Sequence, residues 1–365
     1  MIYTIGYARG LAALFVVLFH FRDYINGVYS QKNLGEILFG PGVSGVDIFF
    51  IISGFIIVYS TKKIEGNDIA KFIIRRFFRI YPLLILSVIL FTFVTPQEFS
   101  AEQIIKSLIP YHLDYSQEAP YFGYNVYVPA WTITYEVVFY SVFVVSMAVS
   151  HKYRTLICSS IIILLYLYLN THFGDGINFD AHKTINLESQ FSGAGFFYIL
   201  SSPMMTEFVF GMILCELYMK TNSIEIGCMH KISSFYLWFC TGIFLTFWFS
   251  WWSFGHGPLN FGIWAVIIIP AVILYEKFNI IAVNKKLLFL GDISYSIYMT
   301  HIVVVYALGW YADYIPLYKN LSGFSKLFYV VTICISVAYI CHVLIEKPMH
   351  KFSRKLISKI DSVSH

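Results

Sequence analysis

Apolar stretches alternate with short polar segments along almost the whole chain. A helix of about 20 apolar residues spans the hydrocarbon core of a bilayer, and ten stretches approach that length. They cover residues 6–26, 44–62, 80–95, 130–150, 155–170, 196–218, 234–253, 259–276, 287–309 and 325–345. The third and fifth are short, so each either extends beyond these limits or merges with a neighbour. The pattern predicts an all-α, polytopic membrane bundle of about ten transmembrane helices.

Composition supports a membrane protein. Of the 365 residues, 58% are hydrophobic and 13% are charged, whereas a soluble domain carries roughly 25% charged residues. The six cysteines show no paired spacing, so we expect neither a disulfide framework nor a metal site. The net charge of +4 gives no reason to expect nucleic acid as a partner. The first apolar run lacks a basic leader and a cleavage site, so it is expected to remain as the first span.

The distribution of basic residues predicts the orientation. Most of the 25 lysines and arginines lie at the start of the chain or after the even-numbered runs. By the positive-inside rule, both termini are cytoplasmic. We therefore divide the chain into a membrane domain, residues 1–346, and a basic cytoplasmic tail, residues 347–365. The two longest outer segments are then about 96–129 and 171–195. The first is rich in tyrosine, which suits either sugar stacking or the membrane interface.

The first apolar run carries an arginine where it begins and a histidine well inside it. Arg9 and His20 are eleven positions apart, which is about three helical turns, so both point to nearly the same side about 16 Å apart. A charged side chain facing lipid costs at least ~2.5 kcal/mol, so we expect both to line one internal cavity. The alternative is that the arginine snorkels to the headgroups and the histidine bonds a neighbouring helix.

Polar residues inside the predicted spans fall into two layers. Near the outer face lie Asp47, Glu136, His20 and His301; near the inner face lie Arg9, Arg75, Arg76, Arg79, Asp292 and Glu346, with Glu207 between the layers. An imidazole beside a carboxylate can act as a general base on a hydroxyl. Guanidinium groups suit phosphates because they offer planar, paired donors. Interhelical hydrogen bonds for the acids, and positive-inside anchoring for the arginines, remain the alternatives.

At these residues the chain resembles the acyltransferase-3 family of integral membrane acyltransferases. Five segments in the family's order carry the resemblance: Arg9 with His20, Gly45–Phe55 (GVDIFFIISGF), Arg76–Pro82 (RFFRIYP), Pro129–Glu136 (PAWTITYE) and Gly291–His301 (GDISYSIYMTH). The chain departs from the family at Thr132, where serine is usual, and at Ile133, where leucine is usual. The proline that often follows the histidine is absent after His301.

The resemblance implies a bacterial inner-membrane O-acyltransferase that uses cytoplasmic acyl-CoA, most simply acetyl-CoA, and modifies a hydroxyl of a surface or lipid-linked polysaccharide. His20 would be the catalytic base, oriented by Glu136 and Asp47, and Arg9 would stabilise the donor or the thioester oxyanion. We assign donor binding to Arg9, Arg75, Arg76, Arg79 and Ser53. Acceptor binding is assigned to Trp131, Tyr135, Tyr298 and His301.

Two other classes of function fit part of the pattern. Intramembrane histidines and carboxylates also build proton relays, so a proton-coupled transporter or glycan exporter is the main alternative. Such transporters tend to show two related halves with broken spans in matching places, and this sequence shows none. A membrane scaffold explains neither the arginine pair nor His20. The sequence leaves the acceptor sugar, the acyl chain length and the oligomeric state open.

Overall fold

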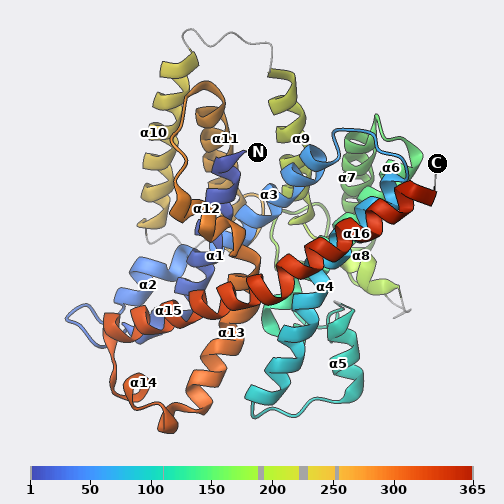
Figure 1. The fold of residues 1–365 in the computed structure, drawn as a ribbon. Coiled ribbons are helices and arrows are strands. Elements are labelled where there is room, and N and C mark those ends of the chain that lie inside the picture. Colours follow the sequence, from blue (N-terminus) through green and yellow to red (C-terminus); the bar gives the residue numbers. More distant parts are fainter. Residues whose placement is uncertain (1, 110, 188–192, 222–228, 251–254, 364–365) are drawn as a thin grey trace.

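The computed structural model describes residues 2–109, 111–187, 193–221, 229–250 and 255–363, which are mainly helical and contain no strand (Figure 1). The helices are α1 (Tyr3–Phe21), α2 (Leu34–Phe39), α3 (Gly45–Ser60), α4 (Asp68–Val94), α5 (Ala101–Leu108), α6 (Trp131–Val149), α7 (Arg154–Phe173), α8 (Ala194–Leu200), α9 (Met205–Lys220), α10 (Met229–Trp248), α11 (Phe261–Phe278), α12 (Lys285–Asp292), α13 (Ser294–Trp310), α14 (Pro316–Asn320), α15 (Gly323–Cys341) and α16 (Lys347–Val363). The all-α class predicted from the apolar runs is confirmed.

Seven described helical stretches, some of them made of consecutive helices, are long and apolar enough to cross a membrane. They are Tyr3–Tyr24, Leu34–Ser60, Asp68–Val94, Val128–Val149, Arg154–Phe173, Phe261–Phe278 and Gly323–Ser362. Two further pairs, α8 with α9 and α12 with α13, qualify together but bend by 59° and 64°, which raises the number to nine. The one predicted run left over, the seventh (234–253), corresponds to α10, whose first turn contains His230 and Lys231 and is therefore less apolar. Residues 251–253 of that run lie outside the described residues.

Helix α1 packs against four other helices, α3, α11, α12 and α13. Glycines allow the closest of these approaches. A Cβ atom at Gly10 of α1 would lie 2.7 Å from the backbone nitrogen of Gly291 on α12. Between α3 and α9, a Cβ atom at Gly54 would lie 2.1 Å from the carbonyl oxygen of Phe208. Small residues at such crossings let helix backbones pack directly, which drives helix association in membranes.

The C-terminal segment is a helix that crosses the bundle. A π-helical turn, His342–Glu346, joins α15 to α16, and Figure 1 shows the two as one long diagonal that passes over α4. Helix α16 packs along α4, and the buried Lys71 of α4 forms an ion pair of 2.5 Å with Asp361. The segment expected to be a basic tail is thus packed against the bundle over its described part, and its cytoplasmic side remains a prediction.

Candidate active site

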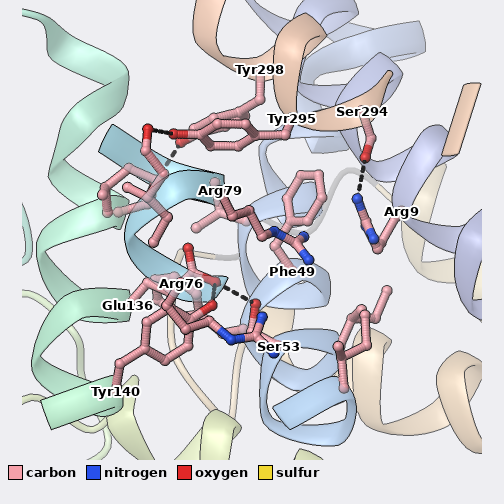
Figure 2. A pocket seen from close by; sticks show the side chains of 17 residues that line it. Arg9, Phe49, Ser53, Arg76, Arg79, Glu136, Tyr140, Ser294, Tyr295 and Tyr298 are labelled. Atoms are coloured by element: carbon pink, nitrogen blue, oxygen red, sulfur yellow. Dashed lines mark hydrogen bonds between the residues drawn. The ribbon is translucent and has the colours of Figure 1, made fainter. Parts of the chain in front are cut away.

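A cavity of about 60 Å³, here called the inner chamber, lies between α1, α3, α4, α6 and α13. Three arginines reach it from two helices: Arg9 from α1, and Arg76 and Arg79 from α4. Residues three positions apart on a helix share a face, which explains why Arg76 and Arg79 both point inward. In Figure 2, Arg79 extends into the space between Arg9 and Arg76. The structure therefore brings together three residues that the sequence analysis assigned to the donor.

The bend between α12 and α13 holds Arg9 in place. Its Nη2 donates to the Ser294 Oγ at 3.0 Å and to the Gly291 carbonyl at 3.4 Å. The close packing of Gly10 against Gly291 brings α1 near enough for these bonds. On α4, the Arg76 Nη2 donates to the Ser60 Oγ at 3.0 Å. Both arginines are therefore fixed by neutral partners.

None of the three arginines forms an ion pair with a carboxylate in the part of the chain that the structure describes. The Arg76 Nε is buried and has no hydrogen-bond partner among these residues. Gathering like charges in a poorly hydrated space is costly unless something neutralises them. An anionic ligand with several oxygens would satisfy these donors, since charge-assisted bonds to guanidinium groups are among the strongest available.

Arg75 does not join this group. Its side chain is 42% exposed and its Nη2 lies 2.7 Å from Glu65 Oε2. Although it is adjacent to Arg76 in sequence, it does not line the inner chamber, and instead lines a separate cavity that Arg76 and Arg79 also border. The assignment of Arg75 to the donor is therefore weaker than that of Arg76 and Arg79.

Glu136 lines the same chamber from α6, where Ser53 and Tyr140 hold its carboxylate. Ser53 Oγ donates to Glu136 Oε1 at 3.1 Å, and the Tyr140 hydroxyl donates to the same oxygen. Figure 2 shows Glu136, Ser53 and Tyr140 together at the side of the chamber near Arg76. Glu136 thus lies with the arginines, and the expected contact in which it orients His20 is not present.

His20 lies at the other end of α1, in its last turn, where its side chain is exposed. Its ring lies 5.0 Å, centroid to centroid, from the fully buried ring of His301 on α13. Arg9 and His20 therefore both face α13, as the helical period predicts. His20 lines neither the inner chamber nor any other described cavity that Arg9 lines, so the expectation that the two residues share one internal cavity is wrong.

His301 connects His20 to that chamber. Its Nδ1 lies 2.8 Å from the carbonyl oxygen of Tyr298, which can only accept, so Nδ1 carries the proton. The Nε2 is left as a potential proton acceptor and has no partner among the described residues. The ring of Tyr298 lies 5.9 Å from that of His301, and Tyr298 lines the inner chamber while bonding the Thr132 hydroxyl at 2.9 Å.

The carboxylate of Asp47 bonds His256 and Gly257 and not His20, so the prediction that it orients His20 is not met. Its Oδ2 lies 2.8 Å from the Nδ1 of His256, and its Oδ1 accepts from the Gly257 backbone N–H at 2.9 Å. Asp47 lies in the first turn of α3, on the side of the helix that faces the turn before α11. Gly257 adopts a φ of +115°, which favours glycine and turns its N–H toward the carboxylate. The buried Glu207 is close enough to interact with Asp47.

Two of the predicted acceptor residues lie beside this group of Asp47 and His256. The Trp131 ring lies 5.4 Å from that of His256, and the Tyr135 ring packs against Trp131 while its hydroxyl donates to the Pro120 carbonyl at 3.1 Å. Both are buried and neither lines the inner chamber. Sequence reasoning missed His256, although a histidine between two glycines and before Pro258 indicates a tight turn whose side chain faces the protein.

Comparisons with known proteins agree with the resemblance. Residues 2–350 match the family model described as an acyltransferase domain. The chain belongs to the acyltransferase-3 family. It is also similar to the exopolysaccharide production protein ExoZ of Rhizobium meliloti (strain 1021), with 25% identity over 273 residues that cover 72% of this chain and 76% of that protein. No solved structure matches the chain.

Membership of the acyltransferase-3 family makes the chain a multi-pass membrane acyltransferase, which needs an acyl donor and an acceptor. The family match favours an enzyme over the transporter that the buried polar residues also allowed. No group of three or more histidine, cysteine or acidic side chains is arranged to hold a metal ion in the described ranges.

Proposed function

We propose that the protein transfers an acyl group, most simply acetyl, from acyl-CoA to a hydroxyl of a surface or lipid-linked polysaccharide. The observation that carries this proposal is the cluster of Arg9, Arg76 and Arg79, which has no carboxylate partner in the described chain and suits a phosphorylated donor. The name of the Rhizobium relative supports exopolysaccharide as the acceptor class. The basic-residue pattern supports an orientation in the bacterial inner membrane with the arginines on the cytoplasmic side.

In this proposal the two ends of α1 have separate tasks. Arg76 and Arg79 bind phosphate oxygens of the donor, and Arg9 donates to the thioester oxygen as negative charge develops on it. Glu136, held by Ser53 and Tyr140, places a negative charge near Arg76 without bonding it. The inner chamber is narrow, which fits the thin pantetheine arm of coenzyme A better than a folded nucleotide.

At the other end, His20 removes the proton from the acceptor hydroxyl as its oxygen attacks the thioester carbonyl. The carbon–sulfur bond breaks, an ester bond forms, and the coenzyme A thiolate leaves and takes up a proton. His301 lies beside His20 with a free Nε2, so it can accept a hydrogen bond from the imidazole or the acceptor. A direct route requires Tyr298 and His301 to let the thioester pass toward His20.

The test is transfer of label from radioactive acetyl-CoA to purified surface glycan by the purified protein. We expect labelled glycan from the wild type and a loss of at least about a hundredfold in rate for His20→Gln, as general-base catalysis contributes 10²–10⁴. His172→Gln is the matched control, because His172 is an exposed histidine at the end of α7. Full activity of His20→Gln would reject His20 as the base, and label that stays on the coenzyme would reject the enzyme.

A further inference from the structure

A larger cavity of about 860 Å³, here called the mouth chamber, adjoins the inner chamber, and residues of α16 line part of it. The two chambers share Arg9, Arg79 and Tyr295 as lining residues. A third cavity of about 370 Å³ lies beside α16 and shares Arg79, His350 and Arg354 with the mouth chamber. Arg79 thus lines all three, so the three cavities adjoin one another around its side chain.

The charge of the mouth chamber is strongly basic. Five lysine and arginine side chains and two histidines line it against only two carboxylates, those of Asp292 and Glu346. Ser296 donates to Glu346 Oε1 at 2.5 Å, and the His342 Nδ1 lies 2.9 Å from its Oε2. The five cationic side chains outnumber the two carboxylates, so the lining keeps an excess of positive charge, and the volume lies within the ~300–1,000 Å³ typical of small-molecule sites.

The residues that α16 contributes lie on one face. His350 and Arg354 are four positions apart and point toward Arg79, and Lys347 and Lys351 flank them. Lys355 is in the same turn as Arg354 but lines none of these three cavities. Some basic residues of α16 therefore face the mouth chamber, and others, such as Lys355, do not.

Contacts at both ends hold this face in position. At its start, Glu346 bonds Ser296 of α13; near its end, Asp361 pairs with the buried Lys71 of α4, which lies 3.8 Å from Glu65 as well. A wall fixed in this way binds a ligand without first having to be ordered, which lowers the entropic cost of binding.

We propose that α16 forms the second half of the donor site, in which His350, Lys351 and Arg354 bind phosphate groups at the nucleotide end of the acyl donor. This inference rests on the proposed function, since it assumes an acyl-CoA donor. The phosphates enter between α16 and Arg79, and the pantetheine arm continues past Arg79 and Arg9 into the inner chamber. Anionic lipid headgroups offer the same phosphate chemistry, so the test must separate the two sources.

The test compares Arg354→Gln with Lys355→Gln in the full-length protein, using calorimetric titration with coenzyme A in nanodiscs of neutral phosphatidylcholine. Each change removes one positive charge from the same turn, but only Arg354 lines the cavity. We expect Arg354→Gln to raise the Kd of coenzyme A about ten- to a hundredfold, as expected for loss of a charge-assisted bond, and Lys355→Gln to change it less than about twofold, because an exposed charge outside the site is screened. His350→Asn is the second cavity variant, and we expect it to raise the Kd in the same direction.

Two further arms identify what the helix binds. With S-acetylpantetheine, which has no phosphate group, Arg354→Gln should transfer acetyl groups with the same kcat/KM as the wild type. Equal losses from Arg354→Gln and Lys355→Gln, or a loss seen only in nanodiscs with anionic phosphatidylglycerol, would assign the helix to lipid and overturn the inference. Wild-type coenzyme A binding with unchanged affinity in both cavity variants would also overturn it and leave the proposed function intact. A wild type that binds no coenzyme A would refute the proposed function itself.

Discussion

Substitution of Arg79 should separate donor binding from stability more clearly than any other change in the inner chamber. The matched control is Lys319→Gln, which removes a surface cation outside these cavities. Arg79 lines all three cavities and has no ion pair in the described chain, whereas Lys319 lines none of them, is exposed and pairs with Asp313. Arg79→Gln removes one guanidinium from a donor phosphate, which is worth about 1.5–3 kcal/mol of binding, or roughly a ten- to 150-fold increase in Kd. Lys319→Gln removes a surface ion pair, which contributes little to stability, and should change the Kd only slightly.

The stability of the ligand-free protein provides the second measurement. Arg79 lies near Arg9 and Arg76 without a carboxylate partner, so its removal relieves repulsion. We expect the melting temperature of ligand-free Arg79→Gln to equal or exceed that of the wild type. Coenzyme A at 100 times its Kd should stabilise the wild type by about 2.7 kcal/mol, and the same concentration should stabilise Arg79→Gln much less. A lower melting temperature for Arg79→Gln with an unchanged Kd would show that Arg79 is structural, and the reasoning would be refuted.

Three further changes test the fold around the site. Gly54→Ala places a Cβ atom 2.1 Å from the Phe208 carbonyl oxygen, so it should lower the free energy of unfolding in detergent by about 1–3 kcal/mol, whereas Gly242→Ala on α10, with open space around it, should be neutral or stabilising. Asp47→Ala leaves His256 and the Gly257 N–H without their partner and should lower the free energy of unfolding by about 3 kcal/mol. Asp47→Asn should keep most of the transfer rate, and an inactive but well-folded Asp47→Asn would instead indicate that Asp47 acts directly in catalysis. Burial lowers the pKa of His112, in the segment between α5 and α6, to about 3. The folded protein therefore keeps it neutral while the unfolded chain protonates near pH 6.5, so stability should fall by about 1.4 kcal/mol per pH unit below pH 6.5, and His112→Gln should remove that slope.

The parts of the fold that sequence predicted are those governed by local periodicity. The apolar runs located the helices, and the 3.6-residue period placed Arg9 and His20 on one side of α1. The sequence Ser201-Ser202-Pro203 indicates the bend between α8 and α9, since the residue before a proline disfavours the helical conformation. The sequence around the bend between α12 and α13, at Ile293, has no proline to indicate it, and Gly291 next to it packs closely against α1.

Contacts between segments that are far apart in the chain could not be predicted from the sequence. Asp47 and His256 are 209 positions apart, and the second lies in a turn without periodicity, so depth in the membrane alone suggested the wrong partner for Asp47. Glu136 was placed in the outer layer by counting residues, but Ser53 and Tyr140 draw its carboxylate toward the arginines. The basic residues of α16 were read as a positive-inside signal, and charge counting cannot show which of them face a cavity.

Transfer across a sealed membrane tests the central claim most directly. The protein is reconstituted into vesicles so that the α16 end faces the lumen, with labelled acetyl-CoA inside and acceptor glycan outside. The account predicts that label appears on the outside glycan while coenzyme A stays in the lumen, and that His20→Gln abolishes the transfer. Label found only on glycan enclosed with the donor would contradict a path from the arginines to His20.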